Sequence, residues 1–504
     1  MKTLITLDVG TTAVKAGLFS QDLKPLGFVI EEYTLYTPQN DIVELDPDIY
    51  WKSASSVIKK LLSDAKATPG DVVCITCTTQ GETLIPVDKN INPLRNAIVW
   101  LDNRAKKESS YLEKRFSAKE FYAKTGLPEM TPTWPVAKVL WLKNNEPDVY
   151  YKTHKILLLE DYLVAKMTGK FVTNPGIMCT SGYFDIVNNK VWTEIIDYCG
   201  IDAAKIPKVL PCGMVVGNLC EEACKSFGLP SIVKVTTGAM DQITASIGSG
   251  NIRDGIITES TGTAQVIAAT CTDPGLENWK NVTVYTHGIP GKFLLVNVSQ
   301  TAGIILKWFR DEFCPDLKER FGEKVFDAMG NLASTAPPLS KGLLLFPYFT
   351  GTQIPKADPN TRGVFFGMGL DTGRDCFIRA IMEGVGYMLR ESIDLLKQTG
   401  IKPDAVCALG GGSKSRIWNQ IKADICNILI KTMEQEEAAS VGAAILGSVA
   451  CGLFADIDQA CALLHEKEEF IPNEQNNSLY NKGYMRYKSM YEMFNPLFNS
   501  IETE

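Results

Sequence analysis

Short apolar runs alternate with helical patterns along this 504-residue chain. Residues 3–7 and 13–19 are two extended apolar stretches on either side of a Gly/Thr turn, which predicts a β-hairpin. Runs rich in β-branched residues at 256–258 and 266–269 indicate further strands. Apolar residues recur at helical spacing between 375 and 400 and predict a long helix. Strands that alternate with helices are typical of an α/β protein.

Three further boundaries can be placed from the pattern. Asp46 followed by Pro47 has the form of a helix start, with a capping acid and a proline in the first turn. The apolar run 232–235 leads to Asp241, after which residues 243–247 are expected to be helical. A third apolar run, at 405–409, precedes three glycines and a helix expected from residue 417.

The pattern also indicates a duplication. A Gly/Thr turn follows an apolar strand at 8–12 and again at 260–263, and each turn is followed by another extended run. At this length one hydrophobic core usually gives way to two. We therefore predict two related halves, residues 1–247 and 248–504, each of which supplies one phosphate-handling turn.

Composition and charge narrow the class of protein. Hydrophobic residues make up 45% and charged residues 22%, as in an ordinary globular protein. A net charge of -7 without a basic run argues against nucleic acid as a partner. Residues 438–455 carry no charge, but Ala, Gly and Ser dominate them, so we expect a buried helix and no membrane span. The N-terminus lacks a signal-peptide pattern and the 14 cysteines are scattered, which together predict a cytoplasmic protein.

Glycine-rich turns are the candidate phosphate sites. Consecutive backbone N–H groups bind phosphate, and small residues allow a close approach. The turn at 8–12 adds the Asp8 carboxylate, which could hold hydrated Mg²⁺, although a structural hairpin fits this motif equally well. The similar turn at 260–263 favours the phosphate interpretation. Glycines 410–412 could lie against an adenine ring or form a strand-to-helix turn, and both alternatives remain open.

Asp241 is the candidate catalytic base. It follows an apolar strand and a glycine, which places its carboxylate at the end of a strand. A hydroxyl that attacks a γ-phosphate needs a proton acceptor beside it, and a carboxylate can serve. An acid that only caps the next helix fits the spacing equally well.

Together these motifs resemble the FGGY family of carbohydrate kinases, over residues 8 to about 454. The resemblance implies two actin-like, ribonuclease H-like ATPase domains with a cleft between them, the first binding the sugar and the second the nucleotide. It implies ATP and Mg²⁺ as cofactors and Asp241 as the base. The residues that it implies for the nucleotide and its phosphates are Asp8, Gly10, Thr11, Thr12, Lys15, Thr261, Gly262, Thr263, Gly303, Gly411, Gly412 and Ser413. The metal would lie at Asp8 and Asp241. The residues that it implies for the acceptor are Gln80, Gly81, Glu82, Trp100 and Asp241.

The resemblance also bears on the acceptor. Glycerol kinases carry an Arg where this chain has Gly81 and an aromatic residue where it has Thr133, so we expect a longer acceptor that uses the room beside Gly81. Typical xylulose kinases carry Met-His in the segment that corresponds to residues 79–83, and this chain has neither residue there. A pentulose such as xylulose is the preferred acceptor, with glycerol or another polyol as the alternative.

Two further expectations concern partners. An actin-like chaperone ATPase or a sugar-sensing regulator is the alternative from another class, but such proteins usually append a further domain. As partners we expect a small-molecule sugar or polyol and, as one option, a second copy of the chain in a homodimer, with no nucleic acid and no membrane.

Overall fold

The computed structural model describes residues 2–278, 282–352, 358–498 and 500. The chain forms two compact units, each made of segments that lie far apart in the sequence. The first unit consists of residues 1–252, 272–294 and 437–464. The second consists of residues 253–271, 295–436 and 465–504.

A six-stranded sheet in the order β14-β15-β6-β1-β2-β3 forms the centre of the first unit. Its strands are β1 (Thr3–Val9), β2 (Ala13–Ser20), β3 (Pro25–Glu32), β6 (Val72–Thr79), β14 (Val215–Asn218) and β15 (Lys234–Met240). β1, β6 and β15 are neighbouring parallel strands, whereas β1-β2, β2-β3 and β14-β15 are antiparallel. Because the three parallel strands point the same way, their carboxyl ends meet at one edge of the sheet.

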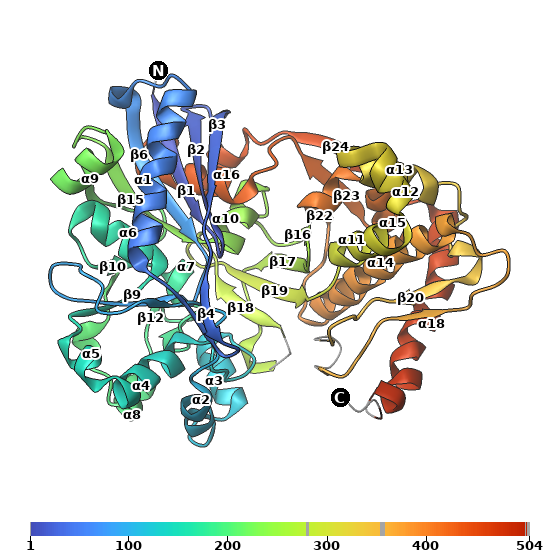
Figure 1. The fold of residues 1–504 in the computed structure, drawn as a ribbon, viewed down its shortest axis with the longest axis horizontal. Coiled ribbons are helices and arrows are strands. Elements are labelled where there is room, and N and C mark those ends of the chain that lie inside the picture. The colour runs from blue at the N-terminus through green and yellow to red at the C-terminus, as the bar shows by residue number, and fades with distance from the viewer. Residues whose placement is uncertain (1, 279–281, 353–357, 499, 501–504) are drawn as a thin grey trace. The chain divides into compact units, whose positions relative to one another are not determined.

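Helices cover both faces of this sheet. α1 (Pro47–Asp64) begins at Asp46, whose side chain accepts a hydrogen bond from the next helical N–H, as the sequence predicts. Ile75 and Cys77 of β6 belong to the core cluster that includes the buried face of α1. Cys74 instead lies against α16 (Ala438–Ala450). Successive side chains of a strand point to opposite faces, so α1 and α16 cover opposite sides; Figure 1 shows α1 lying along β1, β2 and β3.

A five-stranded sheet and shorter elements complete the first unit. The sheet has the order β4-β5-β8-β7-β9, with β4 (Tyr36–Gln39), β5 (Ile42–Leu45), β7 (Leu84–Val87), β8 (Ala97–Ile98) and β9 (Lys155–Leu158). The remaining helices include α2 (Lys106–Glu113), α3 (Ala118–Thr125), α4 (Pro135–Asn145), α5 (Pro147–Lys152), α6 (Leu159–Thr168), α7 (Pro175–Met178), α8 (Thr193–Cys199), α9 (Glu221–Phe227), α10 (Asp241–Gly248) and α17 (Ile457–Cys461). Short strands are β10 (Val172–Thr173), β11 (Phe184–Asp185), β12 (Lys190–Val191), β13 (Lys208–Val209) and β18 (Thr283–Thr286).

The second unit has a sheet in the order β19-β17-β16-β22-β23-β24. Its strands are β16 (Ile256–Thr261), β17 (Gln265–Cys271), β19 (Phe293–Ser299), β22 (Ala405–Leu409), β23 (Leu429–Met433) and β24 (Glu466–Phe470). A separate pair is β20 (Leu344–Phe346) with β21 (Val364–Phe366). The helices include α11 (Gly303–Phe313), α12 (Pro315–Phe321), α13 (Val325–Ala333), α14 (Arg374–Gln398), α15 (Arg416–Cys426) and α18 (Glu474–Phe498).

The two sheets repeat one plan, which confirms the duplication that the sequence indicates. The antiparallel pair β1-β2 and the parallel strands β6 and β15 of the first unit correspond to β16-β17, β22 and β23 of the second. Each series ends in an antiparallel edge strand, β14 or β24. In each unit the first Gly/Thr turn joins the first two strands. The α/β class and its two sheet-rich domains are therefore as expected, whereas the division at residues 247 and 248 stays a prediction.

Most predicted elements form where the pattern places them, but one strand is displaced. Only the second half of the run predicted at 232–235 belongs to β15, which begins at Lys234 and continues through Gly238 to Met240. A Cβ atom at Gly238 would lie 1.7 Å from the Cys77 carbonyl oxygen of β6, so glycine allows the strand to continue beside its neighbour. The next helix forms as predicted, but α10 begins at Asp241, two residues before the expected start at residue 243.

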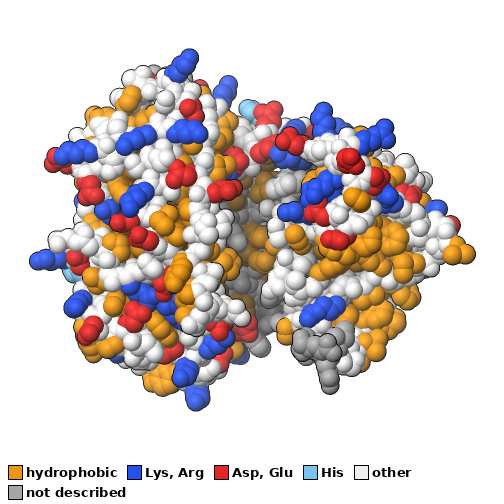
Figure 2. All heavy atoms as spheres, in the orientation of Figure 1, with side chains coloured by type: hydrophobic (Ala, Val, Ile, Leu, Met, Phe, Trp, Pro, Cys, Tyr) orange, Lys and Arg blue, Asp and Glu red, His pale blue; other side chains and the backbone are white. Residues whose placement is uncertain are grey.

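The uncharged segment after residue 437 forms a buried helix, as predicted, because α16 packs through small residues against α10. In the part of the chain that the structure describes, no helix has both the length and the apolar character needed to cross a membrane. All 14 cysteines are free thiols. On the face drawn in Figure 2, acidic and basic side chains are interspersed.

Candidate active site and nucleotide pocket

Polar residues gather at the carboxyl ends of β1, β6 and β15 in the first unit. Asp8 is near the end of β1, Gln80 follows β6, and Asp241 follows β15. Because these strands are parallel neighbours, the topology brings together the three segments that the sequence predicts for phosphate, acceptor and base.

Asp241 is the first residue of α10, with Met240 at the N-cap position. Its Oδ1 accepts a hydrogen bond of 2.6 Å from the Gln242 N–H. The pKa of Asp241 is raised to about 7, mainly by burial and also by the nearby Asp8 carboxylate, while the Gln242 N–H opposes the shift. The side chain therefore helps to bind the helix terminus and also has the proton affinity of a base near neutral pH.

Asp8 is the second carboxyl group at this edge. Burial raises its pKa to about 6; Lys15 lowers the pKa and Glu437 raises it. Lys15 lies opposite Asp8 in the β1-β2 pair, and its ammonium forms an ion pair with Glu437, the residue before α16. Lys15 therefore lies beside the turn at 8–12, and Glu437 partly neutralises its charge; its role toward the nucleotide stays a prediction.

The turn between β1 and β2 is held by its neighbours. The Gly10 N–H donates to the Ala13 carbonyl at 2.9 Å, and the Thr12 carbonyl accepts from the Tyr33 N–H at 2.9 Å. The Tyr33 hydroxyl also donates to the Gly10 carbonyl. Thr11 Oγ1 accepts a 2.9 Å bond from the Trp100 indole, which joins this turn to a predicted acceptor residue.

Gln80 is buried directly after β6. Its N–H donates to the Val9 carbonyl at 3.0 Å, and its Nε2 donates to the Tyr50 hydroxyl at 3.2 Å. Gln80 Oε1 is a buried acceptor without a partner among the described residues. An unpaired buried acceptor is costly, so this oxygen is suited to a ligand hydroxyl.

The space beside Gly81 differs from the expectation. A Cβ atom at Gly81 would lie 3.0 Å from Thr180 Cγ2 and 3.2 Å from Met240 Sδ. The prediction that Gly81 leaves open room is therefore wrong at its Cβ position, because those two side chains fill the space. A larger residue at position 81 would have to displace both.

Glu82 lies in the left-handed region, with a φ of 54°, which is uncommon for a residue other than glycine. Burial raises its pKa to about 7, Lys138 lowers the pKa, and Asp241 raises it. Lys138 was not assigned a role from the sequence. The available signal is a lone lysine within the apolar run 135–142, and in the structure this side chain is completely buried.

The second unit contains a cavity of about 500 Å³, which is within the range of ligand pockets. It is lined by half of the residues predicted for the nucleotide and its phosphates, together with apolar side chains and a few charged ones. The predicted residues among them are Thr261, Gly262, Thr263, Gly303, Gly411 and Gly412, and the apolar ones include Ile304, Phe326, Met382 and Trp418.

Glycines in this pocket have two distinct roles. A Cβ atom at Gly303 would lie 2.3 Å from the Gly262 carbonyl oxygen, and one at Gly412 would lie 2.6 Å from Thr261 Cβ. These two glycines therefore permit close backbone packing. Gly262 and Gly411 instead have nothing within 4 Å of the Cβ position, so they leave space in the pocket.

Ser413 does not line the cavity. Its Oγ donates to the Gly410 carbonyl at 2.7 Å, and its carbonyl accepts from Asn419 Nδ2 at 2.7 Å. These bonds fix the turn between β22 and α15, so the structure supports a structural role for this side chain and leaves contact with the nucleotide to the preceding glycines.

A buried ion pair supports the turn at 261–263. Lys422 Nζ donates to Glu259 Oε2 at 2.7 Å and to Thr261 Oγ1 at 2.9 Å, and both charged side chains are 0% exposed. Glu259 also accepts from Thr261 and from Gln265 at its other oxygen. The network fixes the end of β16, from which the turn projects.

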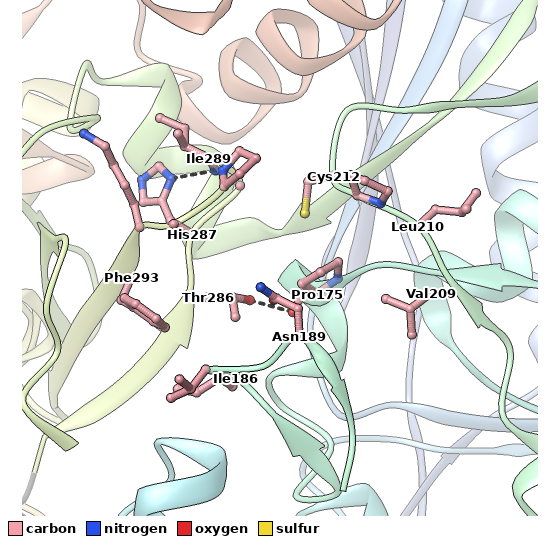
Figure 3. A pocket seen from close by; sticks show the side chains of 16 residues that line it. Pro175, Ile186, Asn189, Val209, Leu210, Cys212, Thr286, His287, Ile289 and Phe293 are labelled. Carbon is pink, nitrogen blue, oxygen red and sulfur yellow. Dashed lines mark hydrogen bonds between the residues drawn. The ribbon is translucent and has the colours of Figure 1, made fainter. Parts of the chain in front are cut away.

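Another cavity, of about 310 Å³, is in the first unit (Figure 3). His287 is buried in its wall, with Nε2 at 3.2 Å from the Asn251 carbonyl and Nδ1 accepting from the Ile289 N–H. Burial lowers the pKa of His287 to about 4. Thr286 donates to the Pro175 carbonyl at 2.7 Å. These polar groups bond to the chain itself, so this wall shows no catalytic arrangement.

The chain belongs to the FGGY family of carbohydrate kinases: the family's N-terminal domain model matches residues 3–248 and its C-terminal domain model matches residues 259–451. It is therefore a sugar kinase, and kinases of this family use ATP as the phosphoryl donor.

The comparisons extend over the full chain. A xylulose kinase of Staphylococcus epidermidis is 29% identical over 501 residues, which cover 99% of this chain and 98% of that protein. The crystal structure of a ligand-bound xylulose kinase from Lactobacillus acidophilus has a TM-score of 0.89 at 27% identity and covers 100% of both chains. A gluconate kinase structure from the same organism has a TM-score of 0.88 at 27% identity, with 99% of this chain and 100% of that chain covered.

Proposed function

We propose that this kinase transfers the γ-phosphoryl group of ATP to a hydroxyl of a five-carbon ketose such as xylulose, with Asp241 as the base. The observation that carries the proposal is the position of Asp241, at the carboxyl edge of the first sheet beside Asp8 and Glu82, with a pKa raised to about 7. Two of the three similar proteins described above are named as xylulose kinases, which supports xylulose as the acceptor.

The chemistry requires one proton acceptor. As the acceptor hydroxyl attacks the γ-phosphorus, its proton passes to the Asp241 carboxylate, the bond from the γ-phosphorus to the bridging oxygen breaks, and ADP leaves. The turn at 10–12 is proposed to orient the transferred phosphoryl group through backbone N–H groups and the two threonine hydroxyls. In the second unit, the pocket that Gly262 and Gly411 leave open is proposed to hold the nucleotide.

The Mg²⁺ ion is proposed to lie at Asp8 and Asp241. The two carboxylates raise the proton affinity of this edge, and a divalent cation would offset their repulsion. Mg²⁺ usually keeps several waters and needs only one or two carboxylates besides the phosphates. Among the described residues, no three or more His, Cys, Asp or Glu side chains are grouped so that they could hold a metal ion. The bound ion would neutralise phosphate charge.

The acceptor is proposed to be an uncharged polyhydroxyl compound. Gln80 Oε1 is a free acceptor and Glu82 a carboxylate, whereas the cations at this edge are already engaged. Lys138 donates to backbone carbonyls, Lys15 pairs with Glu437, and Arg104 is bonded to carboxylates. The site therefore favours a neutral sugar over the gluconate anion, although a gluconate kinase is among the similar structures.

The remaining assignments follow the same division. We propose that residues 1–247 bind the sugar and residues 248–504 the nucleotide, and that the enzyme acts in the cytoplasm, where its free thiols would stay reduced. A homodimer remains an open prediction.

A coupled assay of ADP release over xylulose, ribulose, xylitol, glycerol and gluconate tests the acceptor. We expect kcat/KM for xylulose to exceed that for glycerol and gluconate by at least about tenfold, because buried polar groups discriminate against a ligand that leaves them unpaired. A higher kcat/KM for glycerol or gluconate would refute the pentulose assignment and leave the kinase assignment intact.

A further inference from the structure

Lys138 is a lysine without contact to solvent: it is 0% exposed and lies in the first turn of α4. Removing an ammonium group from water is costly unless hydrogen bonds and an opposite charge replace the lost hydration. The positions of its partners therefore indicate what this residue does.

The ammonium group bonds to two separate loops. Nζ donates to the Val99 carbonyl at 2.9 Å, to the Trp100 carbonyl at 3.4 Å and to the Glu82 carbonyl at 3.4 Å. An ammonium group has three N–H donors, so these carbonyls use all of them. One loop follows β6 and carries Glu82, and the other follows β8 and carries Trp100, the two residues proposed to bind the acceptor.

The backbone of Glu82 needs such support. Its left-handed conformation is held at the N–H by Thr180 Oγ1 at 3.3 Å and at the carbonyl by Lys138. Strained backbone of this kind costs on the order of 1–3 kcal/mol and persists only where neighbours fix it. The next residue, Thr83, accepts from the Trp100 N–H at 3.2 Å, so the two loops also bond to each other.

Charge adds a second effect. Lys138 opposes part of the rise that burial and Asp241 give to the pKa of Glu82, and Glu82 in turn opposes the lowering, to about 7, that burial gives to the pKa of Lys138. The other charges near Lys138 are Asp102 and Arg104, which bond to each other at 2.7 Å. Glu82 is consequently the carboxylate that Lys138 balances.

We propose that Lys138 is a positioning residue for the acceptor, which joins residues 80–83 to residues 99–102 and sets the affinity for the sugar without touching it. The inference rests on the proposed function, because it takes Glu82 and Trp100 as acceptor residues. The role assigned to Lys138 follows from its hydrogen bonds to backbone carbonyls of both loops.

The test compares Lys138→Met with Lys205→Met. Lys205 is also buried in the first unit and donates to one backbone carbonyl, that of Thr153, so it controls for the loss of a buried lysine. We expect Lys138→Met to raise KM for the acceptor about 10- to 100-fold, since small misplacements of positioning groups have effects of this size. The Kd of ATP, measured by calorimetry without sugar, should stay within about twofold in both variants.

A double-mutant cycle with Glu82→Gln separates positioning from general damage. If Lys138 acts through Glu82, the acceptor KM of the double variant should not exceed that of the worse single variant. If the fold increases in KM of the two single variants multiply in the double variant, the residues act independently and the proposal is overturned. An acceptor KM within about twofold of wild type in Lys138→Met, or parallel losses of sugar and ATP affinity, would also overturn it.

Two provisions keep the result interpretable. If Lys138→Met does not fold, Lys138→Gln takes its place. This substitution keeps an N–H donor but removes the charge, and the expected and contradicting changes in KM are the same. All KM values are taken with the best acceptor from the panel above, so a failure of the pentulose assignment is seen in the wild-type enzyme, and a failure of the Lys138 proposal is seen only in the variants.

Discussion

Three carboxyl groups, of Asp8, Glu82 and Asp241, share one edge of a sheet, and burial raises the pKa of each. A group that accepts a proton during catalysis works best when its pKa is near the working pH. The pKa of about 7 at Asp241 meets this condition, and the value depends on the charge of Asp8 as well as on burial.

Asp241→Asn should reduce kcat by roughly 10²- to 10⁴-fold, the usual effect of removing a general base. The amide oxygen can still accept from the Gln242 N–H, so the helix start should be kept, and ATP affinity and thermal stability should change little. Steady-state kinetics with calorimetry check this, and Asp375→Asn in the first turn of α14 is a matched control. A variant with more than about half of the wild-type kcat would exclude Asp241 as the base.

Glu160 offers a pH test of stability away from the metal residues. Its Oε1 accepts from the Gly238 N–H at 2.7 Å and from Asn174 Nδ2 at 2.8 Å, whereas its buried Oε2 has no partner among the described residues. Burial raises its pKa to about 7, and these two hydrogen bonds lower it. The ordinary pKa of a glutamate is 4.5. Between about pH 4.5 and 7 the folded protein therefore keeps this proton, whereas the unfolded chain has lost it. The free energy of unfolding consequently falls as pH rises through that range.

Glu160→Gln imitates the protonated acid and keeps an oxygen for both donors. The difference in free energy of unfolding, variant minus wild type, should increase by roughly 1–3 kcal/mol between pH 5 and pH 7.5 and then stay constant. Urea unfolding across this range measures the difference. A difference between the two proteins that does not vary with pH would contradict the raised pKa.

At the scale of elements, the approach of α10 to α16 stands out. A Cβ atom at Gly442 of α16 would lie 1.8 Å from the Thr244 carbonyl oxygen, and one at Gly248 of α10 would lie 1.9 Å from the Ala438 carbonyl oxygen. The backbones of the two helices therefore touch without intervening side chains. Because Asp241 is the first residue of α10, this contact helps to fix the position of Asp241, the proposed base.

Gly442→Ala tests that contact. In an open helix the change would stabilise by up to about 1 kcal/mol, but here the methyl group would meet backbone, and we expect a net loss of about 1–3 kcal/mol or more. The midpoint temperature of thermal unfolding and kcat should both decrease, because α10 has to move. Gly330→Ala is the control, because its Cβ would meet only side-chain atoms, at 3.3 Å from Ile417 and 3.6 Å from Ser415. An equal or higher stability for Gly442→Ala would contradict the contact.

The same elements show what the sequence can predict. The β1-β2 hairpin, the start of α1 and the strand β22 follow from local alternation, capping residues and glycines, and these signals lie within a few residues of one another. The packing of α16 on α10 and the bonds from Lys138 to two loops join residues far apart in the chain. A single sequence carries no local signal for such pairs, so the clustering of site residues was predicted only through the family resemblance.

At the scale of the whole molecule, two copies of one strand plan serve different tasks. The first unit places carboxylates where its parallel strands end, and the second places glycines and an open pocket at the corresponding ends. Shared topology explains why the Gly/Thr turn recurs, and the different side chains at those ends fit the proposed division between acceptor chemistry and nucleotide binding.

The first unit closes only with residues 437–464, which carry α16. During synthesis the ribosome releases the strands β1, β6 and β15 long before that helix, so the sheet face that α16 covers stays open while the intervening chain is made. The nascent first unit must therefore wait in an incomplete state, with apolar surface that chaperones could bind. Asp241, the proposed base at the start of α10, therefore reaches its final position only after residues 438–450 have been synthesised.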